Sequence, residues 1–171
     1  MIRVLLSEKH IEQIAQTIAQ KLNSMYMGEA EESVVLAPIL QGAVPFYHEV
    51  AKRLEFDPYV DFIGISSYEG TTQKEFNIYK MFDPEMVSGR VVWLFDDLAD
   101  SGNTLQFLKN MLLQYGAKDV KVCVLLKKAH CSFPVDIVGQ EVGNDWVWGF
   151  GMDAPNGRGR TLNTVYVDET I

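Results

Sequence analysis

Short unbroken apolar runs alternate with segments of helical periodicity through the middle of the chain. The apolar runs predict central strands of a parallel sheet covered on both faces, and they lie at residues 34–40, 60–67, 90–96 and 120–127. Helices are expected at 42–54 and at 104–116, where Gly116 can end the second one. A further helix is expected after Ser7, because apolar residues recur on one face as far as Leu22. This alternation predicts an α/β fold, a parallel twisted sheet flanked by helices with right-handed crossovers.

The pattern changes after residue 128. Short strand-like runs at 135–142, 146–153 and 164–168 follow one another with glycine-rich connections and no helix between them. They are expected to form a small β-rich hood together with the N-terminal segment. The whole chain, 1–171, is therefore interpreted as a single domain, with a core at about 30–128 and a hood at about 1–10 and 129–171.

A polar stretch at 68–76 shows little periodicity, and a strand at 77–82 would return from it. Long polar loops are uncommon in compact domains and are often functional. We expect this stretch to be a mobile loop that closes over a ligand.

Composition narrows the class of protein. The formal net charge of -8 and the pI near 4.8 weigh against a dedicated binder of nucleic acid or of anionic membranes. No apolar run approaches the roughly 20 residues of a membrane span.

The two cysteines, Cys123 and Cys131, lack metal-ligand or redox spacing, so reduced thiols in the cytoplasm are expected. His10, His48 and His130 are scattered, and surface or helix positions explain them.

The stretch "VVWLFDDLADSGNTL" at 91–105 carries the most specific chemistry. A buried strand runs into acidic residues, and a turn of small polar residues opens the next helix. The free backbone N–H groups and the positive dipole end of that helix suit a phosphate. The acids cannot favourably face the same phosphate, so they are expected to hold sugar hydroxyls or a divalent cation. A phosphorylated sugar with vicinal hydroxyls would satisfy both requirements.

This stretch resembles the phosphoribosyl-pyrophosphate signature of the phosphoribosyltransferases. A plain strand followed by helix-capping acids would explain one or two positions but not the whole string. The segments 39–46, 65–70 and 133–153 are similar to the first loop, the mobile loop and the purine-site segment of the hypoxanthine-guanine type. The resemblance covers about residues 34 to 167. It implies transfer of a ribosyl 5-phosphate from 5-phosphoribosyl 1-pyrophosphate to a 6-oxopurine, with Mg²⁺ on the leaving pyrophosphate.

The resemblance also implies roles for the acids and the turn. Asp96 and Asp97 would hold the ribose hydroxyls and Mg²⁺, and Asp153 a second Mg²⁺. Asp100 would exchange a proton with purine N7, although a helix cap is an alternative role for it. The 5′-phosphate would be cradled by four consecutive residues: Ser101, Gly102, Asn103 and Thr104.

Further roles concern the base and the pyrophosphate. Lys128 would donate to the purine O6, with its neighbour Lys127 as the alternative. Trp146 would stack on the base, with core packing as the alternative, and the backbone of Val147 would read the ring edge. The remaining contacts, mainly with the pyrophosphate, would come from Gln41, Gly42, Ser67, Tyr68 and Arg160, with Arg158 competing for the last position.

Two positions depart from the family pattern. Asp96 stands where glutamate is usual, and Gln41 stands where a basic residue is common. A non-catalytic regulator that binds phosphoribosyl ligands, and an orotate or uracil transferase, are the competing interpretations. The preferred base and the subunit number stay open, although such proteins usually form homodimers or homotetramers.

Overall fold

The computed structural model describes residues 1–28, 33–69 and 74–169, without the side chains of 67–69 and 74–75. Its main sheet has seven strands. Six follow the order β5 (Lys74–Lys80), β4 (Ile63–Glu69), β2 (Val34–Leu40), β6 (Val91–Ala99), β7 (Asp119–Lys128) and β8 (Ile137–Val142), and β3 (Tyr59–Val60) pairs with β2. Only the β4–β5 pairing in this sheet is antiparallel. The carboxyl ends of β2, β6 and β7 therefore share one edge of the sheet.

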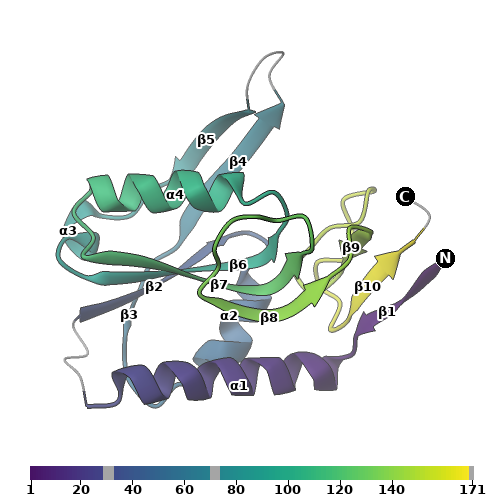
Figure 1. Cartoon of the computed structure of the whole chain (residues 1–171), viewed down its shortest axis with the longest axis horizontal. Helices are drawn as coiled ribbons and strands as arrows, with labels where there is room; N and C mark the ends of the chain where they lie inside the picture. Colours follow the sequence, from purple (N-terminus) through teal and green to yellow (C-terminus); the bar gives the residue numbers. More distant parts are fainter. Residues whose placement is uncertain (29–32, 70–73, 170–171) are drawn as a thin grey trace.

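Helices cover both faces of the sheet (Figure 1). One face packs on α1 (Glu8–Tyr26) and α2 (Val44–Ala51), and the other on α3 (Pro84–Val87) and α4 (Asn103–Gln114). The side chains of successive β6 residues point to opposite faces of the sheet. Trp93 packs in the core under α1 and α2, and Val92 and Leu94 pack in the core under α3 and α4. This period of two, in a strand with no polar face, is what a doubly covered strand requires. The predicted α/β fold is confirmed.

The helix after Ser7 is also confirmed. The Ser7 side chain accepts a hydrogen bond from the His10 backbone N–H at 3.3 Å, and Ile11, Ile18 and Leu22 are buried on one face of α1. Two other helices end earlier than predicted. The helix α2 spans only Val44–Ala51, and α4 ends at Gln114.

A small antiparallel sheet stands apart from the main one, in the order β1 (Ile2–Leu6), β10 (Val165–Asp168), β9 (Trp146–Trp148). It joins the N-terminal segment to the C-terminal part, as expected of the hood. Residues 137–142 were wrongly assigned to it: they form β8, which extends the main sheet parallel to β7. The reason is burial, because Ile137 and Val142 join the core under α1, and residues 129–136 make the parallel connection without a helix.

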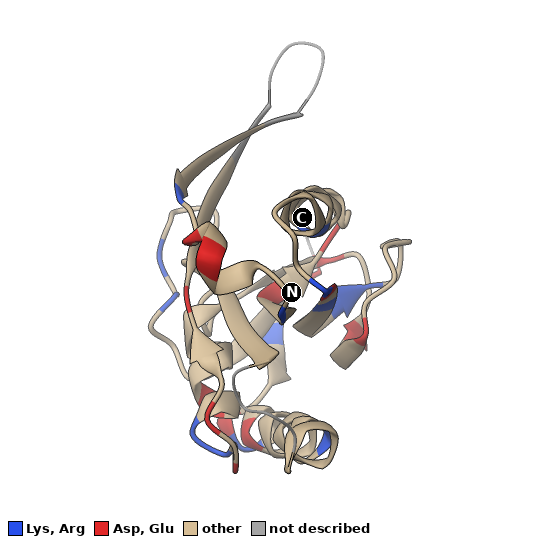
Figure 2. Ribbon diagram, turned by 90° about the vertical axis from the view of Figure 1, so that its left-hand side faces the viewer, with Lys and Arg blue, Asp and Glu red and all other residues tan. Residues whose placement is uncertain are grey.

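Two further expectations were wrong around the β4–β5 ribbon. The predicted strand 60–67 is interrupted at Asp61, whose carboxylate accepts from the Phe62 N–H and from Lys80 Nζ, so that β3 and β4 are separate. Most of the predicted loop 68–76 is strand, because the backbones of β4 and β5 pair from Gly64 to Glu69. This ribbon projects past α4 (Figures 1 and 2). The expected closure of the loop involves residues 70–73, which lie outside the described residues.

Acidic and basic residues are scattered over the chain in Figure 2, without a continuous basic stripe in that view. Across the described ranges, no helix has the length and apolar character needed to cross a membrane.

Candidate functional site

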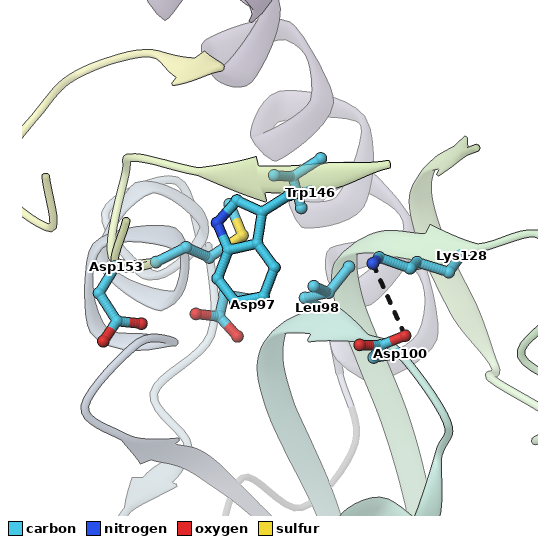
Figure 3. Close-up of a pocket in the computed structure, with 8 residues that line it drawn as sticks. Asp97, Leu98, Asp100, Lys128, Trp146 and Asp153 are labelled. Atoms are coloured by element: carbon cyan, nitrogen blue, oxygen red, sulfur yellow. Dashed lines mark ion pairs between the residues drawn. The ribbon is translucent and has the colours of Figure 1, made fainter. Parts of the chain in front are cut away.

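A cavity of about 220 Å³ lies where the carboxyl ends of β6 and β7 meet the hood (Figure 3). Open α/β sheets bind their ligands at this edge. The lining residues come from the end of β6, the end of β7, β9 and the turn after it: Asp97, Leu98, Asp100, Lys128, Trp146, Val147, Met152 and Asp153. The fold thus gathers the predicted metal, proton-transfer and base-contacting residues around one space.

Lys128 and Asp100 face each other inside this cavity. Strand register causes the contact, because Ala99, the last residue of β6, lies opposite Lys127 of β7, and Asp100 and Lys128 are the next residue of each segment. Lys128 Nζ lies 3.8 Å from Asp100 Oδ1 and donates to the Asn144 carbonyl oxygen at 3.3 Å. The Lys128 side chain is only 8% exposed, whereas the Asp100 side chain is 56% exposed. Lys127 is not among the residues that line the cavity, so the geometry favours Lys128.

Trp146 is an exposed wall of the cavity. Its indole projects from β9 toward Asp97 and Leu98 (Figure 3), and the residue is 39% exposed. Core packing, the alternative role, is therefore wrong for this residue. The next residue, Val147, is buried and pairs with Val167 of β10, which fixes the backbone of β9. The indole offers an open aromatic face to a planar ligand.

A second cavity of about 80 Å³ adjoins the first, since Leu98 and Asp100 line both. Its walls include the acid and the turn of the predicted phosphate site: Asp96, Ser101, Gly102, Asn103 and Thr104. Gly102 is the N-cap of α4, with φ of 81°, and no side chain caps the helix. The capping role considered for Asp100 is therefore wrong. A Cβ atom at residue 102 would also overlap Phe133, so this turn needs glycine both for its φ and for space.

Asp96 and Asp97 lie in the second half of β6, which continues to Ala99 instead of ending at Asp96 as predicted. The Asp97 backbone N–H donates to Asp96 Oδ1 at 3.0 Å. Burial, and then the adjacent Asp97 charge, raise the pKa of Asp96 well above its ordinary value. Burial also raises the pKa of Asp97, against the lowering influence of Asp96, its own backbone contacts and Arg160.

Such a pair of crowded carboxylates fits a divalent cation. Mg²⁺ is usually held by one or two carboxylates plus substrate oxygens and water, not by an all-protein cage. Among the described residues, no group of three or more metal-ligating side chains is assembled, which agrees with a cation that arrives with its substrate. Asp96 and Asp97 would hold it near the ribose hydroxyls, and a bound cation would offset their repulsion.

Arg160 and Asp153 form an ion pair on the hood side of the cavity. Arg160 Nη2 lies 3.0 Å from Asp153 Oδ2, and its Nη1 donates to the Gly151 carbonyl at 2.6 Å. Arg158 instead belongs to a turn in which its backbone N–H donates to Asn156, and it is exposed. The geometry favours Arg160 at the site. Asp153 would have to share its carboxylate between this arginine and a second Mg²⁺.

The first loop lies beside the acids. Gln41 directly follows β2 and is exposed, whereas Gly42 packs against Asp97 and Gly151. Neither residue is among those that line the two cavities. Ser67 and Tyr68 belong to the backbone of β4, and their side chains lie outside the described part of the structure.

Sequence reasoning missed four residues at the site. Leu98 and Met152 line the cavity and give it apolar walls; each is adjacent to a predicted acid, which was the available signal. His130 and Asn144 were missed for another reason. His130 Nε2 lies 2.9 Å from Asp100 Oδ1, and its Nδ1 lies 2.7 Å from Asn144 Oδ1. His130 is exposed, as expected, but these contacts span 30 and 14 residues of sequence, so nothing in the sequence indicated that its ring contacts Asp100.

Comparison with known proteins places these features in a family. Residues 4–155 match the family described as "Phosphoribosyl transferase domain". A hypoxanthine-guanine phosphoribosyltransferase of Streptococcus agalactiae is 33% identical over 156 residues, covering 88% of this chain and 84% of that protein. The corresponding protein of Aquifex aeolicus is 31% identical over 172 residues, covering 98% and 95%.

The fold has close counterparts among solved structures. A hypoxanthine-guanine phosphoribosyltransferase of Bacillus anthracis superposes with a TM-score of 0.87 at 26% identity, covering 97% of this chain and 98% of that one. A hypoxanthine phosphoribosyltransferase of Staphylococcus aureus gives a TM-score of 0.86 at 25% identity, covering 96% and 90%. The similarity in each case includes both the main sheet and most of the hood.

Proposed function

Because the chain belongs to the phosphoribosyltransferase family, we propose that it transfers the 5-phosphoribosyl group from 5-phosphoribosyl 1-pyrophosphate to hypoxanthine or guanine. The products are the nucleoside 5′-monophosphate and pyrophosphate, so the reaction is one of purine salvage. Relatives with this activity in their names cover nearly the whole chain.

The observation that carries the choice of base is the Lys128–Asp100 pair. O6 and N7 lie on the same edge of a 6-oxopurine. With Nζ 3.8 Å from Oδ1, one donor and one acceptor stand side by side, as that edge needs. Lys128 donates to O6, and Asp100 faces N7–H. Trp146 then covers one face of the ring, and Leu98 adds apolar contact.

The adjoining cavity accounts for the sugar phosphate. The uncapped first turn of α4 offers backbone N–H groups to the 5′-phosphate, and Ser101 and Thr104 supply hydroxyl donors. Asp96 and Asp97 face the ribose hydroxyls. Because Leu98 and Asp100 border both cavities, base and sugar meet near the Asp100 carboxylate.

These contacts define what the residues do during the reaction. As the bond from the purine to the ribose carbon forms, Asp100 accepts the proton that N7 loses. Trp146 and Lys128 keep the ring in place while the helix turn holds the phosphate. Phosphoribosyltransferases generally depend on Mg²⁺. When bound, the cation supplies charge neutralisation for the departing pyrophosphate, and Asp96 and Asp97 would hold it with Asp153 at a second position.

The test is incubation with Mg²⁺, 5-phosphoribosyl 1-pyrophosphate and, separately, hypoxanthine, guanine, xanthine and adenine. Nucleotide should form with hypoxanthine or guanine. Adenine should react with a kcat/KM at least about 100-fold lower, because its amino group gives Lys128 no acceptor. Adenine turnover equal to that of hypoxanthine would refute the assignment. No feature of the site favours the non-catalytic regulator, and turnover would exclude it.

For the assembly we propose a homodimer or homotetramer in the cytoplasm. Tyr59, Val60 and Tyr79 are apolar and each more than a third exposed, which gives a second copy a surface to cover. Light scattering coupled to gel filtration tests the subunit number, and a monomeric mass at micromolar concentration would contradict it.

A further inference from the structure

His130 completes a three-residue chain of polar contacts that starts at Asp100. Its Nε2 lies 2.9 Å from Asp100 Oδ1, and its Nδ1 lies 2.7 Å from Asn144 Oδ1. The imidazole is 45% exposed, while Asp100 also lines the cavity for the base. The ring therefore connects the cavity carboxylate with solvent.

The partners of the ring restrict where its protons are. Asn144 Oδ1 is an acceptor, so Nδ1 carries a proton and donates to it. While Asp100 is ionised, the 2.9 Å contact between Nε2 and Asp100 Oδ1 needs a proton on Nε2 as well, because a carboxylate only accepts. Once the ring has given that proton to water, its Nε2 lone pair faces Oδ1. A proton on the carboxyl group of Asp100 can be donated along that contact, after which His130 is a cation beside a carboxylate.

We propose that His130 receives the proton that Asp100 takes from the purine, and passes it to water. The N7–H bond breaks as an O–H bond forms on Asp100. The Nε2–H bond of the exposed His130 ring breaks as water takes its proton, and the O–H bond on Asp100 then breaks as a new Nε2–H bond forms. No electrons are exchanged, and Asp100 is again ionised for the next turnover. The inference rests on the proposed function, and it makes His130 a positioning and relay residue, not a group that touches substrate.

The neighbours of Asp100 favour His130 as the route to solvent. Lys128 Nζ lies 3.8 Å from the same Oδ1 atom that faces His130. The Lys128 side chain is buried and the His130 side chain is 45% exposed, so the imidazole is the neighbour from which a proton can reach water. Asn144, in the connection between β8 and β9, binds Lys128 through its backbone carbonyl and His130 through its side chain. One residue thus holds both partners of the carboxylate.

The experiment compares His130→Gln with His10→Gln in the complete chain. Glutamine can still donate a hydrogen bond to Asp100 but cannot take up a proton. His10 is an exposed histidine of α1, which contributes nothing to the cavity. The readout is the rate of nucleotide formation with hypoxanthine in the first turnover and in the turnovers that follow it, between about pH 5 and 8, the range in which imidazole changes charge. The two phases are recorded separately because Asp100 can accept one proton without His130, whereas each later turnover needs Asp100 ionised again.

We expect His130→Gln to leave the first turnover near the wild-type rate and to lower the rate of the later turnovers about tenfold, less than the 10²–10⁴-fold typical of losing a general base itself. The wild-type rate should fall toward the acidic end as the relay becomes protonated, and this dependence should be lost in His130→Gln but kept in His10→Gln. Free imidazole should restore activity to His130→Ala. Binding of 5-phosphoribosyl 1-pyrophosphate should be unchanged.

The outcomes separate the two proposals. An active wild type whose rate and acidic dependence survive in His130→Gln overturns the relay and leaves the proposed function standing. The relay is equally overturned if His130→Ala is slow but imidazole restores nothing, because His130 then acts only by holding Asp100 in place. A wild type without turnover on any 6-oxopurine overturns both.

Discussion

Gly42 lies directly against the carboxylate of Asp97, so that a Cβ atom at residue 42 would overlap Asp97 Oδ2. On its other side, the Gly42 carbonyl occupies the space that a Cβ atom at Gly151 would need. Two glycines thus allow the first loop to fit between the acids of β6 and the turn before Asp153.

We predict that Gly42→Ala weakens binding of 5-phosphoribosyl 1-pyrophosphate. The added methyl group displaces the Asp97 carboxylate, and a lost hydrogen bond to a charged group costs roughly 1.5–3 kcal/mol. The dissociation constant should therefore rise at least about tenfold, as calorimetry would measure. Gly143→Ala is the matched control, since its Cβ would lie 3.4 Å from Asp145 Oδ2, close to ordinary contact. Unchanged affinity in Gly42→Ala would show that the acids do not depend on this packing.

Lys128→Met should selectively impair the use of the base. Its ammonium group is buried beside Asp100, and its removal leaves O6 without a charged donor. We expect kcat/KM for hypoxanthine to fall at least about tenfold, with little change in binding of the sugar phosphate. Lys127→Met is the control, because Lys127 is absent from the walls of the cavity. If Lys127→Met is the more damaged of the two variants, the one-residue alternative is correct instead.

The part of this site that is contiguous in sequence could be predicted. The part formed by residues distant in sequence could not. Asp96 to Thr104 are consecutive, so the strand, the acids and the helix start are visible as one string. The contact of His130 with Asp100 has no such signal. It arises because β6, β7 and β8 run parallel and in this order in one sheet, so their ends and the Asn144 turn lie close together.

The errors in the fold have physical causes. Asp96 and Asp97 are poor strand formers, yet they remain in β6 because β7 stays paired with this part of the strand as far as Ala99, beyond the last pair with β2 at Phe95. Residues 137–142 follow β7 without an intervening helix, and this pattern favoured a separate hood. They join the main sheet instead, because Ile137 is buried in the core under α1. In both cases tertiary burial overrides the local pattern.

Asp96→Asn should stabilise the substrate-free protein at pH 8 but much less at pH 4. Because burial and Asp97 raise the pKa of Asp96, the folded chain holds this proton more tightly than the unfolded chain does. The free energy of unfolding therefore decreases as pH rises from about 4, the unfolded-state pKa, through the raised folded-state pKa. Asparagine can still accept from the Asp97 N–H, and it removes the buried charge that destabilises the folded protein at high pH.

Thermal unfolding at the two pH values checks this, with the exposed-site variant Asp57→Asn as control. Each kcal/mol gained should raise Tm by about 2–4 °C for a chain of this length. An increase in Tm that is the same at pH 4 and pH 8 would mean that the charge of Asp96 is not the cause.

Asp100→Asn separates catalysis from structure, since Gly102 and not Asp100 is the N-cap of α4. The exposed Asp100 side chain contacts Lys128 and His130, and an amide of the same shape should leave folding intact. It cannot accept the N7 proton, so the single-turnover rate should fall by roughly 10²–10⁴-fold. Tm and binding of 5-phosphoribosyl 1-pyrophosphate should stay near those of Asp57→Asn. A variant that keeps most of its rate would remove Asp100 from the mechanism. The relay through His130 would then have no proton to carry, because the proton reaches the imidazole only through this carboxylate.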